Sequence, residues 1–375
     1  MTDTNTQLIS TISADNKLTL TLQDIEMPQP TENDIIVRIE AAPLNPSDLA
    51  VMFSAANMST ATQSGTEKKP TITAEVSTKF MSAVQARVGK AIPVGNEGAG
   101  TVVATGSSPA AQALMGKTVA VIGGGTYRQY LCANIKSCLV LNEGITAKEG
   151  ASAFVNPLTA LAMVETMRAE GHKAIIHTAA ASNLGQMLNR ICIADSIDLI
   201  NIVRKAEQEI LLREMGAKYV INSSSDNFLA ELTAAIINTG ATIAFDPIGG
   251  GKLTSDILNC MEVAASRDMK EHSVYGSDTF KQVYIYGALD RGPITLNRHF
   301  GFAWGISGFL LFNALGKLGT KTVMSMRKRV VDEITTTFAS HYTHEVSLAE
   351  ALELQSMAAY SKQATGEKYL IIPQK

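Results

Sequence analysis

The chain has 375 residues, of which 46% are hydrophobic and 18% are charged, and its formal net charge is −3. This length predicts two domains, and the balance is that of a globular protein with enough apolar side chains for a buried core. A near-neutral charge without a long basic run gives no support for a nucleic-acid or membrane partner.

Several features of the sequence predict a cytoplasmic protein. The opening residues, MTDTNTQLIS, have neither a basic start nor an apolar core, so we expect no signal peptide. The longest apolar stretch, FGFAWGISGFLLFNALG (300–316), is too short to span a membrane, and we expect a buried helix there. The cysteines are scattered without a C-x-x-C pair, which favours reduced thiols. They are Cys132, Cys138, Cys192 and Cys260.

Residues 1–150 are predicted to form a barrel-like domain. Short β-rich runs such as KLTLTLQDIEMP (17–28), DIIVRIEAAPL (34–44) and GAGTVVATG (98–106) are broken by Gly and Pro, with few helices between them. This pattern is typical of an antiparallel barrel.

One segment interrupts that domain. Residues 54–73, SAANMSTATQSGTEKKPTIT, are rich in Ser, Thr and Ala and predict a mobile loop. The apolar residues after it recur at helical spacing, which predicts either a helix packed on the barrel or a lid over a substrate cleft. They are Val76, Phe80, Met81, Val84 and Val88.

Residues 151–290 alternate regularly between β-rich runs and amphipathic, helix-length segments. KAIIHT (173–178), DLINIV (198–203), ATIAFDP (241–247) and QVYIYGAL (282–289) are the clearest strands. This alternation predicts βαβ units around a doubly wound parallel sheet. Residues 291–375 return to mixed structure, so the overall class is α/β, with a parallel-sheet domain inserted into the catalytic domain.

The stretch HTAAASNLGQ (177–186) joins a predicted strand to a predicted helix. Aligned with G-x-G-x-x-G, it places Ala180, Ser182 and Gly185 at the glycine positions of a dinucleotide-binding turn. Two of the three glycines are replaced by small residues, so the stretch is either a substituted phosphate turn or an ordinary strand-to-helix turn. In the first case, the backbone N–H groups from Ser182 to Gly185 would face the pyrophosphate.

The next predicted strand favours NADPH over NADH. An acidic residue usually follows the turn by about twenty residues and binds the ribose 2′-OH. This chain has Val203 there, followed by Arg204 and Lys205. Two cations suit a 2′-phosphate, and they are poorly placed for a helix start, where the dipole favours negative charge.

With these features, the chain resembles the medium-chain dehydrogenase/reductase superfamily, and in particular its zinc-free quinone oxidoreductase branch. The matching segments run in order through most of the chain. They are AAPLNPSDL (41–49), VGNEGAGTVVATG (94–106), NPLTALAMVE (156–165), HTAAASNLGQM (177–187), REMGAKYVIN (213–222), FDPIGG (245–250) and the closing TGEKYLIIP (365–373). The resemblance implies a GroES-type catalytic domain, an inserted Rossmann domain and hydride transfer from a nicotinamide. It also implies a homodimer formed through the Rossmann edge strand, here QVYIYGAL.

The resemblance adds residues to the expected cofactor site. Its positions are Thr159, Ala180, Ala181, Ser182, Asn183, Leu184, Gly185, Arg204, Lys205, Tyr286 and Gly287.

Departures from the zinc enzymes of this superfamily predict a site without metal. Those enzymes have Cys-His where this chain has Asn45-Pro46, and Gly-His-Glu where it has Gly95-Asn96-Glu97. An amide oxygen is a poor zinc ligand beside thiolate and imidazole. The histidines show no ligand spacing either; they are His172, His177, His272, His299, His341 and His344.

Without a metal, we expect reduction of an acceptor that is already electrophilic, a quinone or an α,β-unsaturated carbonyl. Asn45 is the predicted hydrogen-bond donor to the developing oxyanion, and Asp48 is expected to orient Asn45 or the nicotinamide ribose. NPSD (45–48) also fits an ordinary turn.

Similar 2-enoyl thioester reductases keep a tyrosine shortly after this motif as proton donor. LAVMFSAANMS (49–59) has none, and Tyr127 is the fallback acid. A protein that binds NADPH without turnover is the remaining alternative.

Overall fold

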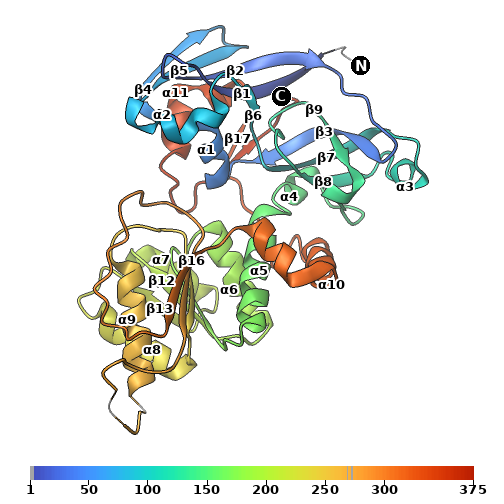
Figure 1. Cartoon of the computed structure of the whole chain (residues 1–375). Helices are drawn as coiled ribbons and strands as arrows, with labels where there is room; N and C mark the ends of the chain where they lie inside the picture. Colours follow the sequence, from blue (N-terminus) through green and yellow to red (C-terminus); the bar gives the residue numbers. More distant parts are fainter. Residues whose placement is uncertain (1–3, 268, 272) are drawn as a thin grey trace. The chain divides into compact units, whose positions relative to one another are not determined.

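Figure 1 shows a computed structural model of the chain, which describes residues 4–267, 269–271 and 273–375. The chain divides into two compact units, one of Met1–Val155 with Arg329–Lys375 and the other of Asn156–Lys328. The second unit is therefore continuous and inserted into the first. It extends beyond residue 290, the boundary expected from the sequence, because residues 304–308 add another strand to its sheet.

The first unit is built on two sheets. One has the order β4-β5-β2-β1-β6, and the other has the order β10-β8-β7-β3-β18-β17 with β9 paired to β3. Alternation places Leu18, Leu20 and Leu22 of β2 in the core, where Leu22 is paired with Leu8 of β1. The strands of the first sheet are β1 (Thr4–Ile12), β2 (Lys17–Glu26), β4 (Ala56–Gly65), β5 (Pro70–Val76) and β6 (Ile92–Pro93). Those of the second are β3 (Asp34–Pro43), β7 (Glu97–Thr105), β8 (Thr118–Ile122), β9 (Tyr130–Asn134), β10 (Cys138–Val140), β17 (His344–Val346) and β18 (Tyr369–Ile371).

The helices of this unit are short. They are α1 (Pro46–Phe53), α2 (Thr78–Val84), α3 (Pro109–Gln112), α4 (Ala147–Gly150) and α11 (Leu354–Tyr360), with 3-10 turns at Gln85–Arg87, Ile135–Ser137 and Glu350–Leu352.

The interrupting segment is not the loop expected from its composition. β4 and β5 form an antiparallel hairpin that extends the first sheet, with Gly65 paired to Pro70 across the turn. β5 buries Ile72, Ala74 and Val76 at alternate positions, whereas β4 lies at the sheet edge and is mostly exposed. The predicted helix after it is present as α2, and none of its residues is buried.

The second unit is a six-stranded parallel sheet with the order β13-β12-β11-β14-β15-β16. Numbered within the unit, this order is 3-2-1-4-5-6, which defines a Rossmann fold. Figure 1 shows α8 and α9 on one face of the sheet and α5 and α6 on the other. The strands are β11 (Ile175–His177), β12 (Leu199–Val203), β13 (Tyr219–Asn222), β14 (Ile243–Asp246), β15 (Lys281–Ile285) and β16 (Trp304–Gly308). The helices are α5 (Val155–Ala169), α6 (Asn183–Ala194), α7 (Ala206–Glu214), α8 (Phe228–Thr239), α9 (Leu253–Ser266) and α10 (Leu311–Asp332).

Two expectations about the end of this sheet are wrong. The segment QVYIYGAL contains β15, which lies between β14 and β16, so the edge strand is β16. The apolar stretch 300–316 is not one buried helix, because it contains β16 and the start of α10 and leaves Phe302 78% exposed. No helix in the described part of the chain combines the length and the apolarity needed to cross a membrane.

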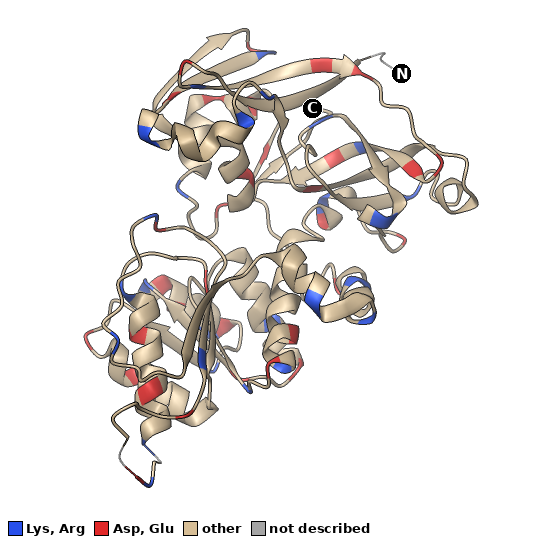
Figure 2. Ribbon diagram, viewed as in Figure 1, with Lys and Arg blue, Asp and Glu red and all other residues tan. Residues whose placement is uncertain are grey.

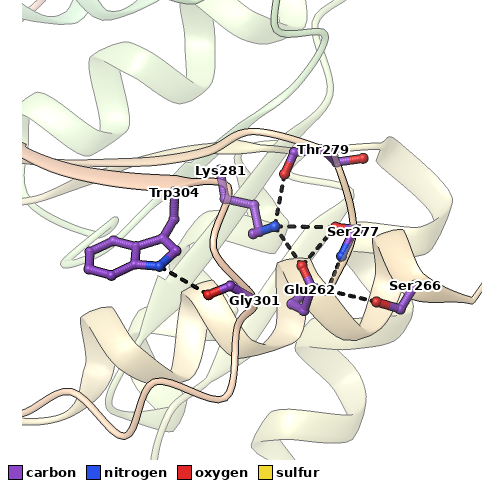
Figure 3. A network of polar contacts seen from close by, with 7 residues as sticks. All are labelled: Glu262, Ser266, Ser277, Thr279, Lys281, Gly301 and Trp304. Atoms are coloured by element: carbon purple, nitrogen blue, oxygen red, sulfur yellow. Dashed lines mark hydrogen bonds and ion pairs between the residues drawn. The ribbon is translucent and has the colours of Figure 1, made fainter. Parts of the chain in front are cut away.

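A buried ion pair joins α9 to the start of β15 (Figure 3). The Lys281 ammonium is fully buried and donates to Glu262 Oε2 at 2.5 Å and to the Thr279 carbonyl at 2.8 Å. Glu262 also accepts from the Ser277 amide at 2.7 Å and from the Ser266 hydroxyl at 2.8 Å. The pair therefore anchors the connection between α9 and β15 to the core of the unit.

Candidate active site

The stretch between β11 and α6 is built as a helix-capping turn. Ser182 is the N-cap residue of α6, and its hydroxyl accepts from the Gly185 amide at 3.2 Å. Ala179 has a positive φ of 48°, a conformation that normally favours glycine, and Ala180 and Ala181 are buried. Asn183 and Leu184 begin the helix. The turn thus begins α6 with an N-cap and has small residues, Ala180 and Ser182, at two of the expected glycine positions.

Gly185 has the close-packing role expected of the third glycine. A Cβ atom at this position would lie 2.1 Å from the Ala180 carbonyl oxygen. Because that contact is with backbone, no side-chain adjustment could relieve it. The first turn of α6 therefore packs against the chain leaving β11 only with glycine here.

The direction of the strand order reverses between β11 and β14. In open α/β sheets, ligands bind at the carboxyl ends of the strands at this point. Asp246 ends β14 and is fully buried, and its carboxylate accepts from the Thr178 hydroxyl next to β11 and from the Ile248 amide at 2.9 Å. The two strand ends are therefore tied together at the switch point.

A second polar pair joins the end of β11 to the residue after β15. His177 Nε2 and the Tyr286 hydroxyl lie 2.7 Å apart, and the two rings stack. Burial lowers the pKa of His177 to about 3, so its imidazole is neutral at physiological pH. Gly287 follows, and a Cβ there would lie 2.5 Å from the Pro247 carbonyl oxygen. The segment after β15, which contains Tyr286 and Gly287, thus approaches the segment after β14 closely.

Arg204 and Lys205 follow β12 directly and are exposed. The Lys205 ammonium pairs with the exposed Glu207 carboxylate at 3.4 Å, an acidic neighbour that the sequence reasoning did not consider. Among the described residues no carboxylate pairs with Arg204, whereas the charge of Lys205 is partly compensated. Thr159 is buried within α5.

In the first unit, Asn45 lies at the start of α1 and is only 2% exposed. Its Nδ2 donates to Glu97 Oε1 at 2.8 Å, and Glu97 Oε2 accepts from the amides of Phe154 and Val155 at 2.8 and 2.9 Å. Glu97 thereby fixes the orientation of the Asn45 amide.

Asp48 is fully buried beside this pair and stabilises the local backbone. Its two oxygens accept from the amides of Asn45 and Asn96, both at 2.8 Å. Burial, reinforced by the nearby Glu97 carboxylate, raises the pKa of Asp48 to about 7. Of the two roles expected of Asp48, the geometry supports orienting Asn45, through its backbone.

Tyr127 is not suited to the fallback role of acid. Its side chain is fully buried, and its hydroxyl donates to the Pro43 carbonyl oxygen at 2.9 Å. Burial raises its pKa well above the ordinary value, which makes proton release harder. Tyr127 is a packing residue that joins the chain before α1 to the strand region of the barrel.

Lys368 belongs to this cluster and was not singled out from the sequence. Its ammonium donates to the Ser152 hydroxyl at 2.8 Å, and that hydroxyl lies 2.8 Å from the Tyr342 hydroxyl. Burial lowers the pKa of Lys368 to about 8, opposed by the Glu97 and Asp48 carboxylates. The sequence feature that could have identified Lys368 is its position next to the strand YLI in the closing motif. Its proximity to Glu97 follows only from the fold.

Within the described residues, no group of three or more His, Cys, Asp or Glu side chains is arranged to hold a metal. At the positions where the zinc enzymes have ligands, Asn45 is bound to Glu97, and Asn96 Nδ2 donates to the Ser47 hydroxyl at 3.0 Å. Among the histidines, His272 lies outside the described residues.

No protein-family model matches the chain. Among curated proteins it is similar to mitochondrial enoyl-[acyl-carrier-protein] reductases. The enzyme of Mus musculus is 26% identical over 280 residues, 73% of this chain and 63% of that enzyme, and that of Xenopus tropicalis is 25% identical over 285 residues. The match thus spans less than two thirds of the mouse enzyme.

Solved structures resemble the chain over nearly its whole length. A protein assigned as an NADPH:quinone reductase from Mesorhizobium loti has a TM-score of 0.74 at 24% identity, covering 100% of this chain and 99% of that one. The Etr1p/NADP/crotonyl-CoA complex has a TM-score of 0.68 at 20% identity, covering 98% and 99%.

The fold, with the turn before α6 in one unit and the site around Asn45 in the other, defines a class of protein in which a Rossmann unit is inserted into a barrel-like unit. The fold is that of these solved reductase structures, and the sequence is similar to the curated enoyl reductases; both agree with a resemblance to the zinc-free branch of the medium-chain dehydrogenase/reductase superfamily.

Proposed function

We propose that the protein is an NADPH-dependent, metal-independent reductase that delivers hydride to a quinone or an α,β-unsaturated carbonyl. The observation that carries this proposal is the turn from Ala179 to Gly185, where a glycine-requiring contact and an N-capped helix lie at the switch point of the sheet. Such a turn presents backbone N–H groups and the positive end of a helix dipole to a pyrophosphate.

The residues of the second unit fit the cofactor. Asn183 and Leu184 supply the first amides of α6, while Ser182 caps the amide of Gly185. Arg204 would bind the 2′-phosphate as a charge-assisted hydrogen-bond donor. Thr159, Ala180, Ala181, Tyr286 and Gly287 would complete the binding surface, together with Lys205. When bound, NADPH supplies the hydride.

In the first unit, Asn45 would polarise the acceptor oxygen that gains negative charge. Glu97 holds the amide in one orientation, and Asp48 holds the turn that carries it. A quinone needs no enzyme acid at carbon, because the hydroquinone oxygen formed by hydride transfer takes its proton from water. Reduction of a quinone therefore suits this chain, in which the first tyrosine along the sequence, Tyr127, is buried.

Reduction of a 2-enoyl thioester is the second candidate. The similarity to mitochondrial enoyl-[acyl-carrier-protein] reductases favours it. As in the reduction of any α,β-unsaturated carbonyl, the product α-carbon requires a proton; no tyrosine occurs between residues 46 and 126 to supply one, so that proton would have to come from water.

Acceptor assays separate these functions from NADPH binding without turnover. Purified protein is mixed with NADPH and either phenanthrenequinone or crotonyl-CoA, and NADPH oxidation is followed by absorbance. Oxidation with the quinone supports the proposal, and oxidation with the thioester alone supports the second candidate. Binding of NADPH, seen by fluorescence, without oxidation by either acceptor would leave a cofactor-binding protein.

We also propose a cytoplasmic homodimer. β16 leaves its outer backbone edge available for pairing with a second copy, which would extend both sheets. The cysteines are free thiols, three of them buried, which suits a reducing compartment.

A further inference from the structure

A cavity of about 500 Å³ lies in the second unit, near the amino ends of β11, β14 and β15. The turn from Ala179 to Gly185 follows the carboxyl end of β11, so the cavity lies toward the other end of the sheet. α5 starts where the two units join and ends at Ala169, which places roughly 20 Å of helix between that junction and the cavity. The lining side chains all belong to this unit and include Glu170, His172, Thr242, Phe280, Gln282 and Tyr284.

The charge of the cavity comes from one carboxylate. Acidic and basic positions are interspersed over the second unit (Figure 2), so a preference for one sign of charge depends on the residues of the cavity itself. None of the lining residues is Lys or Arg, and Glu170 is the one acid among them. His172 Nδ1 lies 2.7 Å from the Thr242 hydroxyl, and burial lowers the pKa of His172, so its imidazole is neutral at physiological pH. The cavity is therefore negative.

Hydrogen-bond donors of the lining residues are already used within the unit. The Tyr284 hydroxyl donates to Glu170 Oε1 at 2.5 Å, and Gln282 Nε2 donates to the Val283 carbonyl at 3.0 Å. Glu170 Oε2 lies 3.8 Å from His172 Nε2, which is beyond hydrogen-bond distance. Within the described residues, this leaves Glu170 Oε2 and the side-chain oxygen of Gln282 as acceptors. A ligand that carries N–H groups and a positive charge would complement them.

Aromatic rings form the apolar part of the cavity. The ring of Tyr284 stacks on that of the buried Phe245, with the centroids 5.5 Å apart, so its position is fixed by the core. Phe280 is 52% exposed and lies beside Gly305 of β16, where a Cβ atom would come within 3.2 Å of Phe280 Cζ and 2.6 Å of Gln282 Oε1. The absence of a side chain at Gly305 thus makes room for both groups. An aromatic face close to a carboxylate attracts organic cations.

We propose that this cavity binds a small organic ammonium ion. Glu170 would accept a charge-assisted hydrogen bond from the ammonium group, Gln282 would accept a second one, and the organic part would pack on Phe280. The volume is within the range of small-molecule sites. An anion would meet Glu170 without a compensating cation. The proposal does not depend on the reductase activity, because the cavity lies away from the turn before α6.

Isothermal titration of the full chain with three related compounds tests this proposal. We expect benzylamine to bind with a Kd of roughly 1 mM or below. Benzyl alcohol and benzoate, which have the same ring without the positive charge, should bind at least about tenfold more weakly. Glu170→Gln should weaken benzylamine binding about tenfold or more and leave benzyl alcohol unchanged. Phe280→Ser, at an exposed position, should weaken the binding of benzylamine and of benzyl alcohol.

The matched control is Glu231→Gln, which removes the same charge from an exposed position on α8 of the same unit. It should leave benzylamine binding within about twofold, since the charge lies outside the cavity. Tyr284→Phe provides a second variant at the cavity. It removes the hydroxyl that occupies Glu170 Oε1, so benzylamine should bind as tightly as in the wild type or more tightly. Circular dichroism verifies that every variant is folded.

Three outcomes would overturn the proposal. The first is that benzylamine shows no saturable binding. The second is that benzyl alcohol or benzoate binds as tightly as benzylamine, which would mean that the positive charge is not recognised. The third is that Glu170→Gln weakens benzylamine binding no more than Glu231→Gln does, which would place the amine elsewhere on the protein.

Discussion

At the scale of single residues, both the turn before α6 and the site around Asn45 depend on side chains that hold backbone or other side chains in place. Asp48 fixes two amides, Glu97 orients Asn45, and Ser182 caps α6. The sequence motifs singled out Asn45, Asp48 and Tyr127, which lie in one region of the first unit. They did not predict that Tyr127 is buried or that Lys368 joins the cluster, because burial depends on strands far apart in the chain.

Mutation of Arg204 or Lys205 should separate recognition of the 2′-phosphate from binding of the rest of the cofactor. Arg204→Ala should weaken NADPH binding by roughly one to two decades in Kd and leave NADH nearly unchanged, since a hydrogen bond to a charged group contributes about 1.5–3 kcal/mol. Lys205→Ala should have a smaller effect, because Glu207 already pairs with Lys205. Fluorescence titration of both cofactors measures this. An equal loss for NADH and NADPH in Arg204→Ala would contradict the 2′-phosphate assignment.

Asn45→Ala should lower kcat on a quinone while leaving the Kd for NADPH nearly intact. Removal of an oxyanion donor can cost roughly 10²–10³ in rate. Asn96→Ala is the matched control, because this neighbouring amide bonds to Ser47 and not to Glu97. Unchanged kcat with weaker cofactor binding would show that Asn45 serves the cofactor.

Stability should depend on pH through His177. The folded protein binds fewer protons at this site than the unfolded chain between pH 3 and 6.5, so stability is full above 6.5 and is lost as the pH falls toward 3. The shift corresponds to roughly 5 kcal/mol of the free energy of unfolding. In urea unfolding across this pH range, the free energy of unfolding should decrease less with falling pH for His177→Gln than for the wild type. His299→Gln, at an exposed position, should match the wild type, and parallel curves for His177→Gln would refute the assignment.

At the scale of elements, regular alternation was predictable and polar strands were not. The βαβ units were predicted because their buried strands are short apolar runs between amphipathic helices. β4 was missed because it is an exposed edge strand of Ser, Thr and Asn, whose composition is that of a loop. β16 was missed because four glycines interrupt the apolar stretch, and its pairing with β15 is set by the fold.

The Glu262–Lys281 pair should stabilise the connection between α9 and β15 strongly. Lys281→Met leaves a buried carboxylate without its cation, which typically costs about 3–5 kcal/mol. Adding Glu262→Gln should restore much of the loss, because the buried charge is then gone. Lys17→Met, in an exposed pair with Asp15, should cost less than about 1 kcal/mol. Denaturant unfolding measures all of them. A loss in Lys281→Met no larger than in Lys17→Met would mean that the pair contributes little.

At the scale of the whole molecule, a continuous Rossmann unit is inserted into a barrel-like unit that has no zinc-ligand set at the matching positions. Sequence resemblance predicted this architecture because its motifs occur in order along the chain. It left the acceptor open, because acceptor choice depends on pocket shape and on a proton donor that no motif identifies.

Transfer of deuterium from the C4 position of labelled NADPH to an acceptor tests the central claim most directly. The labelled cofactor is incubated with the protein and 2-cyclohexenone, in which hydride transfer forms a stable C–H bond, and the product is analysed by mass spectrometry. We expect one deuterium in the saturated ketone, formed without added metal and in the presence of a chelator. NADPH that binds and is never oxidised, by this enone or by a quinone, would contradict the account.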